Sequence, residues 1–296
     1  MNSISAGSIL VAADGSADAD RAVQWAAEQA FLEGRRLVVI TTALPVHPLA
    51  AAGVGSAYVY PVQDLLDRSR RLAQSAAARA VRHRPGLDVG SIGVLGDPSS
   101  IIIDRSSDAH MVVLGSRGRG RLTSRTLGSV SASVSRHAGC PVVVCRPGTD
   151  LKVKHGVLVG ADATPGSFRV VDFAFRQAAL RGQPLTILHC HWDALAAVGR
   201  PRSGYEGEPD LEASRLALGE SIAGFREEYP DVSTTVQVAR GLATDNLATV
   251  ADRHNLVVVG RHPVGSLARR VSAATATSVL ERCHTTVAVV PEEGES

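Results

Sequence analysis

The chain has 296 residues, of which 45% are apolar and 20% charged, a balance that excludes an intrinsically disordered protein. Lys and Arg (31) nearly balance Asp and Glu (29), and the net charge of +2 gives no large basic field that would favour nucleic acid as a partner. The apolar runs are far shorter than the roughly 20 residues that span a bilayer, and no leader pattern opens the chain, so we expect a cytoplasmic protein with no membrane partner.

The first half of the chain alternates short apolar runs with amphipathic stretches. A continuous apolar run predicts a buried strand at 9–13, and small apolar residues at helical spacing predict a helix over 17–34. The pattern continues with a strand at 37–42, a helix at 65–84, a strand at 88–95, a short helix at 101–107, a strand at 111–114, a helix at 127–137 and a strand at 142–145. Alternating strands and helices predict a mostly parallel five-stranded sheet with helices on both faces.

The second half of the chain repeats the first. Residues 8–14 (SILVAAD) reappear at 156–162 (GVLVGAD), an offset of 148, and residues 111–115 (MVVLG) reappear at 256–260 (LVVVG), an offset of 145. The order of the matching runs is kept, and one three-residue deletion explains the change of offset. The repeat therefore predicts a duplicated unit of about 145 residues.

The duplication predicts an α/β protein of two tandem doubly wound domains, residues 1–148 and 154–296. A polar stretch at 146–154 (RPGTDLKVK) joins them. Because this join is too short for free tumbling, we expect the two domains to pair, with the last strand of each as a pairing edge; a homodimer is a further expectation. The Pro- and Gly-bearing segments 44–61 and 192–209 are predicted to be loops over the ligand edge or a partner interface.

A glycine-rich loop follows the fourth predicted strand, at the sheet edge where ligands of such folds bind. Three of its residues are glycines that let backbone approach a ligand closely (Gly115, Gly118 and Gly120). Gly128-Ser129 then opens a helix, whose N-terminus suits a phosphate. Ser129 and Ser131 add hydroxyl groups, and Arg117 and Arg119 add charge. The loop predicts a phosphate site; a segment that merely turns the chain is the alternative.

The spacing Gly115-x2-Gly118-x9-Gly128-Ser129 resembles the glycine signature of nucleotide-binding universal stress proteins. Asp14 after the first strand, Gly96-Asp97-Pro98 after the third, and HAGCPVVV at 137–144 resemble further landmarks of that family. The likeness covers both repeats, so the chain resembles a tandem universal stress protein. The resemblance implies doubly wound domains that pair, and ATP, with or without Mg²⁺, as the ligand of a domain that keeps the signature.

The resemblance also implies roles for residues of the first domain. Asp14 would hold the ribose or the adenine edge, although a cap of the following helix is an alternative role for this carboxylate. The loop glycines and the start of the next helix would bind the phosphates. The complete predicted site is Ala12, Ala13, Asp14, Thr42, Val94, Gly115, Ser116, Arg117, Gly118, Arg119, Gly120, Arg121, Gly128, Ser129, Val130 and Ser131.

The second repeat departs from the signature. Pro263 stands where the first repeat has Gly118, and Ala273-Ala274 replace Gly128-Ser129. Proline removes a backbone donor and fixes φ, so we expect nucleotide binding in the second domain to be weaker or absent. A residual site would use Gly160, Ala161, Asp162, Gly260, Arg261, Gly265 and Thr275.

The resemblance implies an ATP-binding stress-response regulator that signals by nucleotide occupancy. Enzymes of the same broad fold, such as nucleotidylyl transferases and ATP pyrophosphatases, would need an HxGH or SGGxDS motif near the first strand, which the chain lacks. Slow ATP hydrolysis, autophosphorylation on a loop Ser or Thr, and a nucleotide-independent dimeric interaction module are the alternatives. His189 and His191 share a strand face near Asp193, but packed strand histidines are favoured over a metal site.

Overall fold

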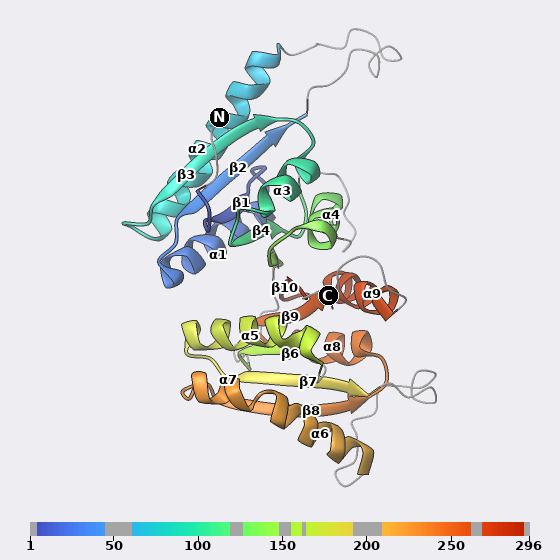
Figure 1. Cartoon of the computed structure of the whole chain (residues 1–296). Coiled ribbons are helices and arrows are strands. Elements are labelled where there is room, and N and C mark those ends of the chain that lie inside the picture. Colours follow the sequence, from blue (N-terminus) through green and yellow to red (C-terminus); the bar gives the residue numbers. More distant parts are fainter. Residues whose placement is uncertain are drawn as a thin grey trace. The chain divides into compact units, whose positions relative to one another are not determined.

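The computed structural model describes residues 5–44, 61–118, 127–147, 155–161, 164–191, 209–261 and 268–292. The chain divides into two compact units, Met1–Cys145 and Arg146–Ser296, which are drawn in Figure 1. Each unit is an α/β fold with a five-stranded parallel sheet, as the sequence predicts.

The sheet of the first unit has the strand order β3-β2-β1-β4-β5, and its paired strands are all parallel. The strands are β1 (Ile9–Ala12), β2 (Leu37–Ala43), β3 (Val89–Leu95), β4 (Met111–Gly115) and β5 (Val142–Cys145). The helices are α1 (Ala17–Glu33), α2 (Val62–His83), α3 (Pro98–Ser106) and α4 (Ser129–His137). Helix α1 packs beside α2, and α3 beside α4. Right-handed crossovers place these two pairs on opposite faces of the sheet.

Local chemistry explains where helices begin a few residues away from the predicted positions. Helix α3 begins at Pro98 rather than at residue 101, because Asp97 caps it by accepting the Ser100 N–H at 2.9 Å, and proline suits the first turn. Helix α4 begins at Ser129 rather than at residue 127, because Gly128 has extended backbone (φ −67°, ψ 148°). The helix predicted at 65–84 begins at Val62.

The second unit repeats this topology with the order β10-β9-β6-β7-β8. Its strands are β6 (Val157–Gly160), β7 (Leu185–His191), β8 (Thr234–Arg240), β9 (Leu256–Arg261) and β10 (Thr286–Pro291). Its helices are α5 (Phe168–Arg181), α6 (Pro209–Ser221), α7 (Ala223–Glu228), α8 (Ala243–Ala251) and α9 (Ala268–Arg282). Phe175 of α5 stacks on Phe225 of α7 with the ring centroids 5.6 Å apart, which fixes α7 against α5.

The strand order of each unit reverses at one point. In the first unit the chain runs outward from β1 to β3 and then crosses to β4 on the other side of β1. In the second unit the same reversal separates β6 from β9. A crevice opens beyond the carboxyl ends of the strands at such a point, and it is here that each unit has a cavity.

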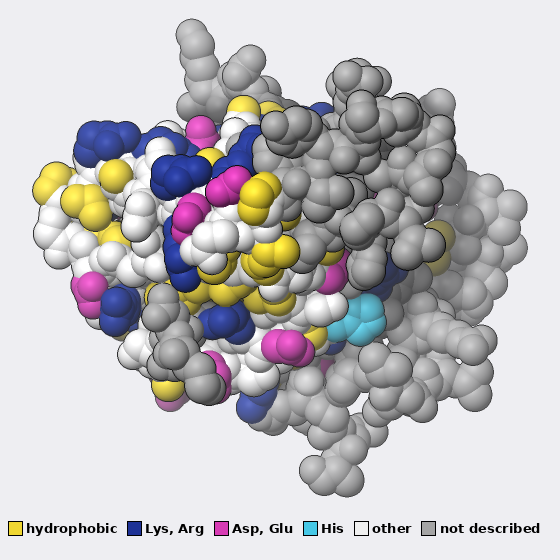
Figure 2. All heavy atoms as spheres, turned by 90° about the horizontal axis from the view of Figure 1, so that it is seen from above, with side chains coloured by type: hydrophobic (Ala, Val, Ile, Leu, Met, Phe, Trp, Pro, Cys, Tyr) yellow, Lys and Arg dark blue, Asp and Glu magenta, His cyan; other side chains and the backbone are white. Residues whose placement is uncertain are grey.

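Charged side chains on the surface of the first unit form local pairs. Arg79 of α2 bonds Asp20 of α1 at 2.7 Å, and Arg36 lies 3.6 Å from Asp88. On the face seen in Figure 2, Lys and Arg side chains lie among Asp and Glu rather than as one continuous field. In the parts of the chain that the structure describes, no helix combines the length and apolar character needed to cross a bilayer.

Candidate functional site

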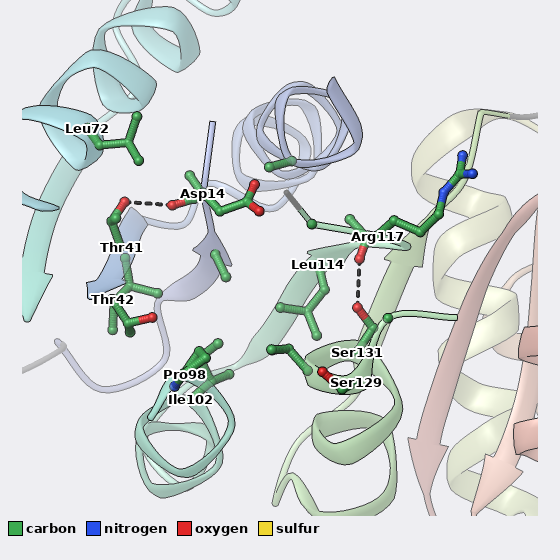
Figure 3. Close-up of a pocket in the computed structure, with 18 of the residues that line it drawn as sticks. Asp14, Thr41, Thr42, Leu72, Pro98, Ile102, Leu114, Arg117, Ser129 and Ser131 are labelled. Atoms are coloured by element: carbon green, nitrogen blue, oxygen red, sulfur yellow. Dashed lines mark hydrogen bonds between the residues drawn. The ribbon is translucent and has the colours of Figure 1, made fainter. Parts of the chain in front are cut away.

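A cavity of about 570 Å³ lies at the switch point of the first unit. The carboxyl ends of β1, β2 and β4 form its floor, and α2, α3 and α4 supply its walls (Figure 3). The structure brings most of the predicted site together here: the lining residues include Ala12, Ala13, Asp14, Thr42, Gly115, Arg117, Gly118, Gly128, Ser129, Val130 and Ser131.

One part of the cavity wall is apolar and was not predicted from the sequence. Leu72 of α2, together with Pro98 and Ile102 of α3, lines this part, and Ile40 and Leu114 contribute from the strands (Figure 3). Apolar residues at helical spacing indicate a core face, and nothing in the pattern separates those that face a ligand cavity from those that face the sheet.

Asp14 lies just beyond the end of β1, between the apolar wall and the glycine loop (Figure 3). Its Oδ1 accepts the Ser16 N–H at 2.9 Å. The N-cap of α1 is Ser16, whose Oγ accepts the Ala19 N–H at 3.2 Å, so Asp14 is not the N-cap itself and supports the helix start only through the Ser16 N–H. A Cβ on Gly118 would lie 2.7 Å from Asp14 Oδ2. The loop therefore approaches this carboxylate closely because residue 118 has no side chain.

The N-terminus of α4 forms another part of the cavity wall. Its N-cap is Gly128, and no side chain of the described residues caps the first turn, so backbone N–H groups at this end are available to an anion. Ser129 is exposed beside them. The Ser131 hydroxyl was predicted to bind phosphate, but in the structure it donates its hydrogen bond to the Gly115 carbonyl at 2.7 Å (Figure 3).

The start of the glycine loop is tied down by buried contacts. The Ser116 carbonyl accepts the Gly128 N–H at 2.8 Å, and the Ser116 N–H donates to the Cys145 carbonyl at 3.0 Å. The Ser116 hydroxyl donates to Asp18 Oδ2 at 2.6 Å. Ser116 is therefore buried beneath the cavity and is not one of its lining residues.

Arg117 does not present its charge to the cavity, contrary to the prediction from the sequence. Its Nε donates to Asp18 Oδ2 at 3.2 Å, and its guanidinium is directed away from the cavity (Figure 3). Burial would raise the pKa of Asp18, but hydrogen bonds from Ser116 and Arg117, with the charges of Arg21 and Arg117, hold that pKa below its ordinary value.

One other predicted residue of this site is described, and it does not line the cavity. Val94 is on β3, opposite Thr42 of β2, so it is one strand further from the switch point and is not among the residues that line the cavity. Arg119, Gly120 and Arg121 lie outside the described residues. The described part of the loop thus consists of its two ends, which the Ser116–Gly128 hydrogen bond joins.

A family model described as the universal stress protein family matches the chain twice, over residues 6–146 and 155–291. The chain belongs to the universal stress protein family. A universal stress protein of Mycolicibacterium smegmatis is 34% identical to it, covering 95% of this chain and 96% of that protein. One of Mycobacterium tuberculosis is 32% identical, with the same coverage. The crystal structure of a universal stress protein from Archaeoglobus fulgidus has the same fold, with a TM-score of 0.66 at 18% identity, covering 97% of this chain and 99% of that one.

The second universal stress protein domain has a smaller cavity at its switch point, of about 190 Å³. Four of the residues predicted for a residual site line it: Gly160, Ala161, Gly260 and Thr275. Arg261 ends β9 but is not among the lining residues, and Asp162 and Gly265 lie outside the described residues.

Two features make the second cavity less suited to a phosphate. Glu292, just after β10, lines the cavity, and its Oε1 occupies the place that a Cβ on Gly260 would take. A carboxylate at this point repels an anion. Helix α9 spans Ala268–Arg282, so the Ala273-Ala274 pair lies inside a helix rather than at its beginning. The backbone N–H groups at this pair are therefore used within the helix.

The two histidines considered for a metal site, His189 and His191, lie on strand β7. His189 Nδ1 lies 3.1 Å from the Ala161 carbonyl oxygen, and Asp193 lies outside the described residues. Within the described ranges, no three His, Cys, Asp or Glu side chains come together as potential metal ligands. The four cysteines are free thiols, and burial raises the pKa of Cys190 and Cys283 to about 12.

Proposed function

We propose that domain 1 of this universal stress protein binds ATP in the 570 Å³ cavity, and that the protein signals through nucleotide occupancy. The observation that carries the proposal is that three kinds of chemical group border one cavity. An apolar wall, a carboxylate and an open helix N-terminus border the same space. Its volume is that of a typical small-molecule site.

Each part of this cavity matches one part of ATP. The wall formed by Leu72, Ile102 and neighbouring apolar residues suits the flat face of adenine. Asp14 is placed to accept hydrogen bonds from the ribose hydroxyls or the adenine edge. The first turn of α4, with Ser129, suits the phosphates. A Mg²⁺ ion would come with the nucleotide, held through phosphate oxygens.

The cavity lining favours occupancy over fast turnover. Among the described lining residues, Asp14 supplies the only carboxylate, and Arg117 is paired with Asp18. Enzymes that transfer phosphoryl groups combine carboxylates that hold metal ions, a residue that orients the nucleophile, and cations at the transferred group. We therefore assign slow ATP hydrolysis or autophosphorylation at most.

Domain 2 is proposed to act without nucleotide, because its cavity is small and contains Glu292. For domain 2 we therefore keep the alternative of a nucleotide-independent interaction module. Pairing of the two domains, a homodimer and a cytoplasmic location stay predictions from the sequence.

The test is to purify the full chain, denature it and identify the nucleotide released. Released ATP, together with one tight site in a calorimetric titration of nucleotide-free protein, supports the proposal. Rapid formation of ADP supports an enzyme instead. A protein that releases no adenine nucleotide and shows no heat of binding supports the nucleotide-independent module.

A further inference from the structure

Asp18 lies in the first turn of α1, outside the cavity, and no sequence motif singled it out. We propose that Asp18 is a positioning residue, whose carboxylate holds the glycine loop where it can meet the phosphates of ATP. For its ligand, the proposal rests on the function proposed above. The positioning role itself is argued from contacts of domain 1, independently of the ligand.

The Asp18 carboxylate accepts hydrogen bonds from the side chains of two consecutive loop residues. It accepts the Ser116 hydroxyl at 2.6 Å and the Arg117 Nε at 3.2 Å, and it pairs with Arg21 on its own helix. Asp18 itself is 7% exposed. Hydrogen bonds to an ionised group in such surroundings are stronger than those between neutral groups, so this carboxylate holds the described start of the loop firmly to α1.

Close packing brings the carboxylate within reach of the loop. A Cβ on Gly115 would lie 2.6 Å from the Asp18 carbonyl carbon and 2.8 Å from the Ala19 nitrogen. The end of β4 therefore rests directly on the backbone of α1, and residue 115 must be glycine for this contact. The Ser16 hydroxyl adds a longer hydrogen bond of 3.4 Å to the Arg117 carbonyl.

A further hydrogen bond connects the loop to α4, the helix whose N-terminus faces the cavity. The Ser116 carbonyl accepts the N–H of Gly128, which is the N-cap of α4. A shift of Ser116 would therefore also move the point at which α4 begins. Without the Asp18 charge, Ser116 and Arg117 lose a common anchor. The phosphate-binding end then loses the pre-organisation on which tight binding depends.

Domain 2 provides an independent observation. The repeat places Gly166, in the 3-10 turn (Pro165–Ser167) that precedes α5, at the position of Asp18, so this position carries no carboxylate. Glu292 supplies one from the segment after β10 instead. A Cβ on Gly166 would lie 3.7 Å from Glu292 Oε2, and a Cβ on Gly260, the counterpart of Gly115, would overlap Oε1. Each domain thus places a carboxylate beside the turn after its fourth strand, from a different element.

The test compares Asp18→Asn with Asp20→Asn in the full chain, by calorimetry with ATP and with adenosine. Asp20 is the matched control, because it lies in the same turn but pairs with Arg79 of α2. We expect Asp18→Asn to weaken ATP binding about tenfold, the effect of about 1.4 kcal/mol, with adenosine affinity unchanged, and Asp20→Asn to behave as wild type. Equal losses for ATP and adenosine, or equal effects of the two variants, would overturn the proposal.

Hydrogen exchange of the ligand-free protein separates this proposal from the proposed function. The Gly128 amide, which bonds Ser116, should exchange faster in Asp18→Asn than in wild type or Asp20→Asn, even if ATP is not the ligand. Unchanged protection of this amide would show that Asp18 does not position the loop. If Asp18→Asn fails to fold, Ser116→Ala removes the same tie from the loop side and should speed exchange at Gly128 in the same way.

Discussion

Replacing Gly118 by alanine tests the contact between the glycine loop and Asp14. The backbone of Gly118 has no positive φ, so alanine is conformationally acceptable there. The added Cβ would lie 2.7 Å from Asp14 Oδ2, and an ordinary contact begins near 3.4 Å, so the carboxylate must retreat by about 0.7 Å. Such a shift removes most of a charge-assisted hydrogen bond to ATP, worth roughly 1.5–3 kcal/mol. We therefore expect ATP affinity to fall by about tenfold or more.

The assay is calorimetric titration with ATP, accompanied by urea unfolding of the same samples. The clash involves the end of a flexible side chain, so the free energy of unfolding should change by less than about 0.5 kcal/mol. Gly139→Ala is the matched control, because its Cβ would find its nearest neighbour at an ordinary 3.7 Å, away from the cavity. If Gly118→Ala is folded and binds ATP as tightly as Gly139→Ala, Asp14 does not contact the ligand.

Other variants probe the remaining parts of the site and its support. Gly128→Val combined with Ser129→Ala should abolish ATP binding in calorimetry while circular dichroism stays that of the folded protein, because the valine Cβ would lie 3.2 Å from the Ser116 carbonyl oxygen and shift the start of α4, and the Ser129 hydroxyl is lost. Titration of the wild type should find one tight ATP site per chain, and a tight site that disappears only on changing Gly260 would contradict the ranking of the domains. Gly115→Ala should lower the free energy of unfolding by about 1–3 kcal/mol in urea denaturation, because its Cβ would meet backbone of α1; wild-type stability would refute that packing. The lowered pKa of Asp18 means that its stabilisation is complete above the unfolded-state pKa of about 3.9 and is lost as the pH falls through the lower folded pKa. Wild type should therefore lose more stability than Asp18→Asn between about pH 5 and pH 2, and parallel acid unfolding curves would contradict this.

The fold of each domain could be predicted because its strands are buried on both faces. The first strand, at Ile9–Ala12, and the fourth, at Met111–Gly115, are continuous apolar runs, which stand out without any knowledge of their partners. Helix beginnings were less predictable. The start of α3 depends on a cap by Asp97, and a polar residue before a proline also fits a turn.

The candidate site could be predicted where glycines, a helix N-terminus or a polar residue at the end of a strand mark it. Glycines and a helix N-terminus are visible in a sequence, and Gly118 and Gly128 do line the cavity. The apolar wall was missed because Leu72 and Ile102 have the spacing of core residues. The pairing of Arg117 with Asp18 was also missed, because a contact between residues 99 apart along the chain depends on how closely β4 packs on α1.

The different origins of the carboxylates in the two domains limit how parts of this protein can be exchanged. A chimera that carries residues 115–131 of domain 1 into domain 2 would bring Ser116 and Arg117 without Asp18, and would set them beside Glu292. To transplant the glycine loop together with its support, Gly166→Asp must be added and the Glu292 carboxylate removed. At these positions the two halves of the duplicated chain depend on different partners, so a substitution beside the fourth strand of one domain has a different consequence at the matching position of the other.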